Sequence, residues 1–315
     1  IRFIIFTFSI RYFFNEIDND AKKLILNLWS IIFFVVSFDL IFEYILGFNM
    51  LGFSSYMPGR LSGFLNQELK IGHFYSAFFL IFLCNLHNFF YNKNVTYFNQ
   101  NIFWLFVILS VSISLMIGER SNFFKVFTMS IFFIFLINRE NLLKKFISIF
   151  VALGIFSLII FNTPYYKYRY WALFIKPVLN NPIEFVLSTD YGSHYLVALD
   201  VFKNHKFFGV GLKNYRLEVQ KKQYDKNASV HPHQTHFEII AELGFIGYIL
   251  FISIFLFNIY FSFKYFLKEN EKLQLSGLLF VMATLIPIIP SGSFFTTFGA
   301  TLFWLNYSFM LPKEN

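Results

Sequence analysis

The sequence VHPHQTHFEIIAELGFIGYILFISIFLFNIYFSF, residues 230–263, joins a polar segment to a long apolar one. Its first seven residues contain three histidines, and no charged side chain follows Glu242 as far as Phe263. A run of about 20 apolar residues is the length that crosses the hydrocarbon core of a bilayer as a helix. The stretch therefore predicts a membrane helix over 236–263, entered from a loop that carries histidines.

The whole chain has the composition of a membrane protein. Of its 315 residues, 57% are hydrophobic and 14% are charged, whereas about a quarter of the residues are charged in a soluble domain. The single cysteine, Cys84, excludes an intramolecular disulfide and a cysteine-rich metal site. We expect Cys84 to be a small residue of the core.

Similar apolar runs recur along the chain and predict an all-α fold. We expect a polytopic transmembrane helical bundle with about 8–9 spans. The expected helices cover 1–14, 24–46, 72–91, 101–117, 123–138, 146–162, 236–263, 274–290 and 294–311. Pro287, Pro290 and Gly292 separate the last two, which leaves open a single broken element. The first run resembles the tail of a helix, so we expect that the natural protein has further residues before it.

One long polar segment, residues 163–235, divides the helices into two groups. It holds ten of the 26 Lys and Arg residues, and apolar spacing predicts a helix within it at 191–204. We therefore expect an N-terminal transmembrane bundle over 1–162, a large, partly helical extracytoplasmic loop over 163–235, and C-terminal transmembrane helices over 236–315.

The basic residues of the short loops give the orientation. If the long loop lies outside, the inside loops hold Arg11, Lys22, Lys23, Lys93, Arg139, Lys144, Lys145, Lys264, Lys268 and Lys272. The outside short loops then hold Arg60, Lys70, Arg120 and Lys125. This asymmetry satisfies the positive-inside rule. Because the basic residues lie between spans, the net charge of +8 favours membrane lipids as partners and not nucleic acid.

Two acids, Asp39 and Glu43, lie four residues apart within an apolar run. Acids inside membrane spans are rare and mark functional positions. We expect this pair to face the bundle and to shape its cavity, with a role in transport as the alternative.

The histidine-rich stretch is the strongest candidate for chemistry. His231, His233 and His236 fall within six residues, and Glu238 and Glu242 follow on the first turns of the helix. A neutral imidazole can take a proton from an attacking hydroxyl near pH 7. The alternatives are a polar cluster that caps the helix and a zinc site formed by the three histidines. The other histidines are expected to be surface or interfacial residues: His73, His87, His194 and His205.

The pattern His-Pro-His-polar, followed by Glu-x-Gly-x-x-Gly at the start of a membrane helix, resembles the bacterial O-antigen ligase/polymerase family. The segments FFGVGLKNYR (207–216), MIGERSNFFK (116–125) and RLSGFLNQELKIG (60–72) resemble further motifs of that family, in the family's order. The resemblance runs from about residue 39 to about residue 255. Departures are Gln234, where relatives usually have Asn, and Asn66–Gln67, where Gly-Asp or Gly-Asn is more usual.

The resemblance implies a glycosyltransferase of the bacterial inner membrane that uses no nucleotide sugar, no cofactor and no metal. Its donor would be a glycan on undecaprenyl pyrophosphate. Its acceptor would be a sugar hydroxyl on lipid A-core for a ligase, or on another lipid-linked repeat for a polymerase. The reaction would take place on the periplasmic face.

The basic residues suit this chemistry, because a pyrophosphate leaving group needs cations at the bilayer surface. Arg120 is the leading candidate, with pairing to Glu119 or to another local acid as the alternative. Arg60 and Arg216 are further candidates for substrate binding, with exposed loop charges as the alternative.

The resemblance assigns the remaining roles. His233 matches the key histidine of the family and would be the base. His231, Gln234 and Glu242 would bind substrate, although a structural role for Glu242 is equally open. Gly244 and Gly247 are expected to allow close helix packing. The alternative function is a flippase or exporter of lipid-linked oligosaccharide, which would place its charges within the spans.

Overall fold

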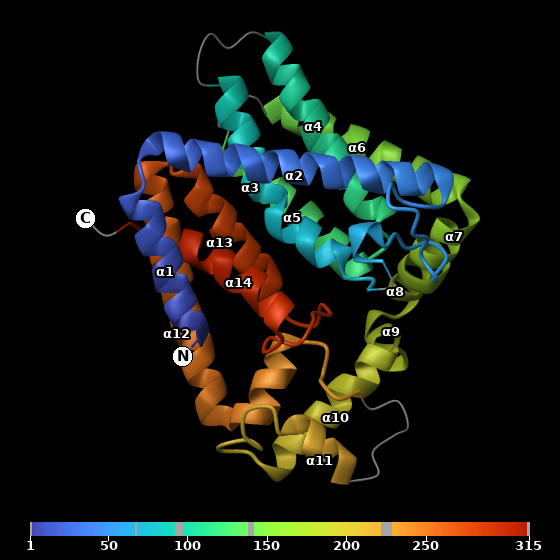
Figure 1. Ribbon diagram of the computed structural model, residues 1–315. Coiled ribbons are helices and arrows are strands. Elements are labelled where there is room, and N and C mark those ends of the chain that lie inside the picture. The colour runs from blue at the N-terminus through green and yellow to red at the C-terminus, as the bar shows by residue number, and fades with distance from the viewer. Residues whose placement is uncertain (1, 67, 92–96, 138–141, 222–228, 314–315) are drawn as a thin grey trace.

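A computed structural model describes residues 2–66, 68–91, 97–137, 142–221 and 229–313, and these ranges contain helices and connecting loops without a β-strand (Figure 1). The all-α prediction is confirmed. The longer helices are α1 (Arg2–Glu16), α2 (Asn19–Leu46), α3 (Ile71–Tyr91), α4 (Tyr97–Met116), α5 (Arg120–Ile137), α6 (Leu142–Asn162), α10 (Asp190–Asn204), α12 (Thr235–Glu269), α13 (Lys272–Thr284) and α14 (Thr297–Met310).

Five of the described helices are long and apolar enough to cross a membrane, namely α2, α3, α5, α6 and α12. Two shorter apolar helices accompany them, Asn101–Met116 within α4 and Lys272–Thr284 (α13). The chain is therefore a multi-pass membrane protein by the length and composition of its helices.

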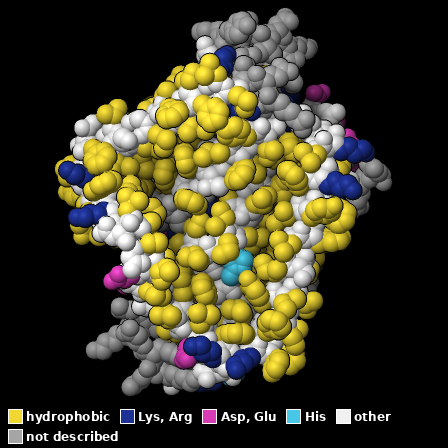
Figure 2. Space-filling view, turned by 180° about the vertical axis from the view of Figure 1, so that it is seen from behind, with side chains coloured by type: hydrophobic (Ala, Val, Ile, Leu, Met, Phe, Trp, Pro, Cys, Tyr) yellow, Lys and Arg dark blue, Asp and Glu magenta, His cyan; other side chains and the backbone are white. Residues whose placement is uncertain are grey.

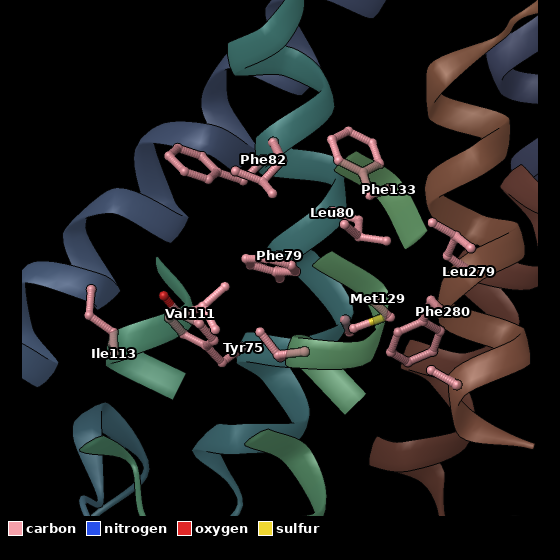
Figure 3. Packing of buried hydrophobic residues seen from close by; sticks show 14 of the residues in the cluster. Tyr75, Phe79, Leu80, Phe82, Val111, Ile113, Met129, Phe133, Leu279 and Phe280 are labelled. Carbon is pink, nitrogen blue, oxygen red and sulfur yellow. The ribbon is translucent and has the colours of Figure 1, made fainter. Parts of the chain in front are cut away.

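The core is built around α3, which packs against α2, α4, α5, α13 and α14. Tyr75, Phe79 and Leu83 of α3 are fully buried. Figure 3 shows Met129 and Phe133 of α5 and Phe280 of α13 together on one side of this helix. Cys84 is also buried, as expected, and its sulfur donates to the carbonyl of Lys272 at 3.0 Å.

The outer surface is unusually apolar for a folded protein. Large apolar side chains on the outer helices are more than half exposed. Examples are Ile31, Phe34 and Phe38 of α2 and Leu250 and Phe257 of α12. Figure 2 shows one face covered by hydrophobic side chains, with Lys and Arg gathered at its margins. A surface of this kind faces lipid and not water.

The last two helices are shorter than predicted. The expected helix 274–290 ends at Thr284, and the expected helix 294–311 begins at Thr297. Pro287 lacks a backbone N–H and disfavours helical geometry in the residue before it, and Ile288 has a φ of 71°. The chain between these helices is therefore an irregular loop, which the proline pattern indicated.

The segment between α6 and α12 is mostly helical and runs along one side of the molecule to the start of α12 (Figure 1). Before α10 it contains α7 (Pro164–Tyr166), a π-helical stretch (Lys167–Ile175), α8 (Lys176–Asn180) and α9 (Pro182–Ser188); α11 (Tyr215–Lys221) follows α10. The predicted helix 191–204 is confirmed as α10, which packs against α12.

The acids of α2 are buried, so they face the bundle as predicted. The carboxylate of Glu43 accepts hydrogen bonds from the backbone of Ser62 at 2.9 Å and of Gly63 at 2.8 Å. Asp39 accepts from the backbone of Met50 at 2.7 Å. The expectation that the pair shapes the cavity is wrong, because both acids instead fix the loop that follows α2.

Candidate functional site

A cavity of about 700 Å³ lies where the ends of α3 and α5 meet α9, α10, the start of α12 and the α13–α14 loop. Four of the predicted site residues line it: Arg60, Arg120, His231 and His233. Gln234, Glu242 and Arg216 do not line it. The structure thus brings together residues separated by more than 170 positions in the sequence.

His233 has an unusual backbone conformation for a residue with a side chain. Its φ is 56°, and its carbonyl accepts a hydrogen bond from Ser291 at 2.7 Å. Its ring packs against His231 and His194, with centroid distances of 3.9 and 5.2 Å. Its Nε2 lies 3.2 Å from the hydroxyl of Ser229. A hydroxyl at this distance has the geometry that proton transfer to an imidazole requires.

The surroundings of His233 keep it neutral. Burial, together with the neighbouring His231 and His194, lowers its pKa to about 4. The pKa values of His231 and His194 are also lowered, chiefly by burial. At neutral pH the imidazole of His233 is therefore in the form that accepts a proton.

Gln234 positions the histidine segment. Its buried side chain caps α12 by accepting from the backbone of His236 at 2.7 Å and of Phe237 at 3.1 Å. Such a cap satisfies backbone donors that a helix leaves free at its N-terminus. The amide is thus used inside the protein, directly after His233.

His236 points away from the other two histidines. Its Nδ1 lies 3.1 Å from the hydroxyl of Tyr248 and its Nε2 lies 2.8 Å from the carbonyl of Leu285. In the part of the chain that the structure describes, no three His, Cys, Asp or Glu side chains are grouped as metal ligands. The arrangement therefore does not form the three-histidine zinc site that the spacing left open.

Arg60 and Arg120 line the same cavity because the loop before α3 packs closely against the loop before α5. The backbone of Leu61 donates to the carbonyl of Ile117 at 3.1 Å, and Gly118, with a φ of 77°, leaves no room for a Cβ beside Gly59. Arg60 forms an ion pair of 2.7 Å with Glu119. The alternative pairing of Glu119 with Arg120 is not what the structure shows.

Arg120 is held by weaker contacts. Its guanidinium donates to the carbonyl of Leu173 at 3.2 Å and lies 5.8 Å from the ring centroid of Phe174. These contacts orient the side chain and leave its positive charge without an acidic partner among the described residues. An arginine in this state is suited to binding an anion.

Arg169 is a cavity residue that the sequence did not single out. It lies in the π-helical stretch, and its Nε donates to the carbonyl of Gly118 at 2.7 Å. Its pKa is lowered by burial and then by the positive charges of Arg60 and Arg120. Three guanidinium groups therefore share this wall. The signal available was a basic residue among aromatic ones in YKYRYW (166–171), a pattern that is too common to be specific.

Glu242 joins α12 to the loop between α10 and α11 by hydrogen bonds. Its carboxylate accepts from the backbone of Lys213 at 2.8 Å, and its carbonyl accepts from Gly211 at 2.8 Å. Gly209 approaches so closely that a Cβ would overlap the backbone of Glu242. Gly244, with a φ of 67° and a ψ of −169°, breaks α12 at the same place. The glycines thus permit a loop to pack on the break in the helix. Gly244 allows close packing as expected, but its partner is the 207–209 backbone and not another helix.

Arg216 lies on α11, exposed and outside the cavity. Among the remaining histidines, His87 and His194 are buried, at 4% and 9% exposure, so the expectation that both are surface or interfacial residues is wrong.

His73 and the buried Lys125 line the cavity and were not predicted to do so. Sequence spacing could not reveal them, because α3 and α5 place them together.

The fold and the site define a multi-pass helical membrane protein with a basic, histidine-bearing cavity. Residues 105–252 match the family model described as O-antigen ligase. These residues form an O-antigen ligase domain, and the resemblance seen in the sequence is confirmed over them. The match contains Arg120, Arg169, His231 and His233 but not Arg60. No curated protein matches the chain.

Proposed function

We propose that this protein is a lipid-linked glycan transferase of the O-antigen ligase or polymerase type. The donor is a glycan on undecaprenyl pyrophosphate, and the acceptor is a sugar hydroxyl of lipid A-core or of a second lipid-linked repeat. The observation that carries the proposal is that His233 lines one cavity with Arg60 and Arg120. A proton acceptor and cations for a pyrophosphate are the two elements that the reaction needs.

The transfer moves one glycosyl group. The acceptor oxygen bonds to the anomeric carbon as the bond between that carbon and the pyrophosphate oxygen breaks. The acceptor proton passes to His233, and undecaprenyl pyrophosphate leaves with the bonding electrons. Arg120, Arg60 and Arg169 stabilise the negative charge that develops on the leaving group. The chemistry assigned to these residues requires no metal ion.

The other predicted site residues support His233 and the segment that carries it. Gln234 caps the helix directly after His233 and fixes the histidine segment. Glu242 holds the 207–213 loop against α12. His231 packs on the ring of His233 and orients it. Arg216 has no place in this mechanism, because it lies outside the cavity.

We further propose that α1, α4, α13 and α14 also cross the membrane, which gives about 8–9 spans in the inner membrane. The regions are then the bundle 1–162, the periplasmic segment 163–235 and the C-terminal helices 236–315. Two contacts support a shared inner face: Lys272 bonds to Asn88 at 3.1 Å, and Arg11 bonds to the carbonyl of Pro312 at 2.8 Å.

The test is a transfer assay on the protein in nanodiscs with EDTA present. The donor is an undecaprenyl-pyrophosphate glycan, and lipid A-core and a second lipid-linked repeat are offered in parallel. Product on lipid A-core identifies a ligase, and longer lipid-linked chains identify a polymerase. Absence of both products, with movement of the donor across a vesicle bilayer, would refute the transferase and indicate a flippase. Activity that EDTA abolishes would refute metal independence.

A further inference from the structure

Lys125 is a buried cation in the wall of the cavity. It lies on α5, is 4% exposed and contributes to the cavity lining. Among the described residues, no hydrogen bond or ion pair reaches its ammonium group. A buried ammonium without a partner lowers the stability of a folded protein, because its lost hydration is not replaced. Its presence therefore calls for a reason other than stability.

The charges around Lys125 do not neutralise it. Five cationic side chains line the cavity within the described chain: Arg60, Lys70, Arg120, Lys125 and Arg169. The carboxylate in that lining belongs to Glu119, which already forms an ion pair with Arg60 and accepts a hydrogen bond from Asn122. The cavity thus keeps a positive excess that a bound anion would balance.

His73 adds a second polar group to the wall of the cavity. It lies near the start of α3, which packs against α5, and it lines the cavity. Its imidazole faces Gly292 of the α13–α14 loop, where an added Cβ would lie 3.9 Å from the ring. A neutral imidazole offers one N–H donor and an ammonium offers three. The two groups together can bind several oxygens of one anion.

A second buried lysine provides the contrast. Lys145 of α6 is 1% exposed, but its ammonium donates to the carbonyl of Phe135 at 3.3 Å and lies 5.2 Å from the ring centroid of that residue. Lys145 lies outside the cavity. The buried lysine that faces no cavity therefore has a hydrogen bond, whereas Lys125 has the longer-range attraction of Glu119 and, among the described residues, no hydrogen bond or ion pair.

We propose that Lys125 and His73 form a second anion subsite, which binds a phosphate or carboxylate group of the donor. Naming the donor rests on the proposed function. Lys125 follows Arg120 by five residues, which is about 7.5 Å along a helix. The subsite adjoins the guanidinium cluster of Arg60, Arg120 and Arg169, because Glu119, the ion-pair partner of Arg60, also attracts Lys125 and His73. The anion comes either from the lipid pyrophosphate or from an acidic sugar of the glycan.

The experiment measures binding of inorganic pyrophosphate and of glucuronate to the protein in nanodiscs by calorimetry. Lys125→Met removes the charge and keeps the length of the side chain, and Lys145→Met is the matched control. Lys125→Met should weaken binding of one probe by about tenfold or more, as expected for a hydrogen bond to a charged group. It should also leave Tm unchanged or raise it, because an unpartnered buried charge is removed.

The two probes separate the sources of the anion. A loss confined to pyrophosphate assigns the subsite to the lipid phosphates, and a loss confined to glucuronate assigns it to an acidic sugar. His73→Gln should weaken the same probe. Equal Kd values for wild type and Lys125→Met with both probes would overturn the proposal, as would an equal loss in Lys145→Met. His233→Ala should bind the probes normally, so failure of the transferase assay would remain distinguishable from failure of the subsite.

Discussion

At the scale of single residues, the behaviour of His233 depends on its neighbours. A positive φ in a residue with a side chain costs about 1–3 kcal/mol and persists where the surroundings fix it. Here Gln234 caps the following helix, and Ser291 binds the carbonyl of His233. The ring is then enclosed by His231 and His194. The strain and the burial are both imposed on the residue that we propose as the base.

The pH dependence of transfer should reflect this environment. The neutral form of His233 accepts the proton, so activity falls as protonation increases. Because its pKa is lowered to about 4, kcat/KM should hold from neutral pH down to about pH 5 and fall as the pH passes through about 4. The measurement is the initial rate against pH, with size-exclusion profiles at each pH as the control for folding. A decline centred near pH 6.5 would contradict the environment described here.

Arg120 should matter far more than Arg216. Removing a cation that stabilises developing charge typically costs about 10²- to 10³-fold in kcat, so Arg120→Ala should lose activity on that order. Arg216→Ala is the matched control, because Arg216 is exposed on α11 outside the cavity; it should retain activity within about twofold. Equal losses in the two variants would contradict the placement of the leaving group beside Arg120.

At the scale of elements, the break in α12 explains how a loop and a helix can form one site. Gly244 turns the helix, and the 207–211 backbone fills the space that opens, with hydrogen bonds from Phe245 to Lys206 at 2.8 Å and from Gly211 to Glu242 at 2.8 Å. This contact ties α10 and its histidine to the helix that follows His233. The Gly-x-Gly and Glu-x-Gly motifs are therefore two halves of one structural contact.

Substituting a glycine by alanine should destabilise the protein at the break in α12 but not within a regular helix. Gly244→Ala places a Cβ against the backbone of Phe207 at a φ of 67°, so it should lower stability by about 1–3 kcal/mol and reduce transfer. Gly154→Ala is the matched control, because Gly154 lies in α6 with open space around it; it should be neutral or stabilising by about 0.5–1 kcal/mol. Thermal unfolding in detergent measures both. A Gly244→Ala variant as stable as Gly154→Ala would contradict the contact.

At the scale of the whole molecule, an apolar outer surface surrounds a helical bundle that carries a basic cavity at one end. The proposed orientation places the 163–235 segment in the periplasm and the basic loops inside. Two of the basic residues used for that orientation, Lys93 and Arg139, lie outside the described residues. The others keep the asymmetry that the positive-inside rule requires.

Cysteine labelling tests the orientation. In a Cys84→Ser background, Leu179→Cys on α8 and Lys268→Cys near the end of α12 introduce exposed thiols at 73% and 78% exposed positions. A membrane-impermeant maleimide should label Leu179→Cys in intact spheroplasts and Lys268→Cys after lysis. The reverse pattern would show that the long segment is cytoplasmic.

The sequence predicted the helical class, the positions of most long helices and four of the residues in the cavity wall. These features follow from local composition and from short motifs, each of which is continuous in the sequence. It did not predict Arg169, His73 or Lys125, because their meeting depends on the packing of α3, α5 and the π-helical stretch. It also assigned the wrong role to Asp39 and Glu43, since their partners are backbone groups of a loop about 10 to 20 residues away.

The role of His233 as the proton acceptor is tested most directly by comparing His233→Ala with His205→Ala in the transfer assay. Loss of a general base costs about 10²- to 10⁴-fold, so His233→Ala should lose activity in that range while still binding pyrophosphate. His205 lies at the end of α10 outside the cavity, and His205→Ala should keep activity within about twofold. Full activity in a stably inserted His233→Ala variant would contradict the assignment of His233 as the proton acceptor.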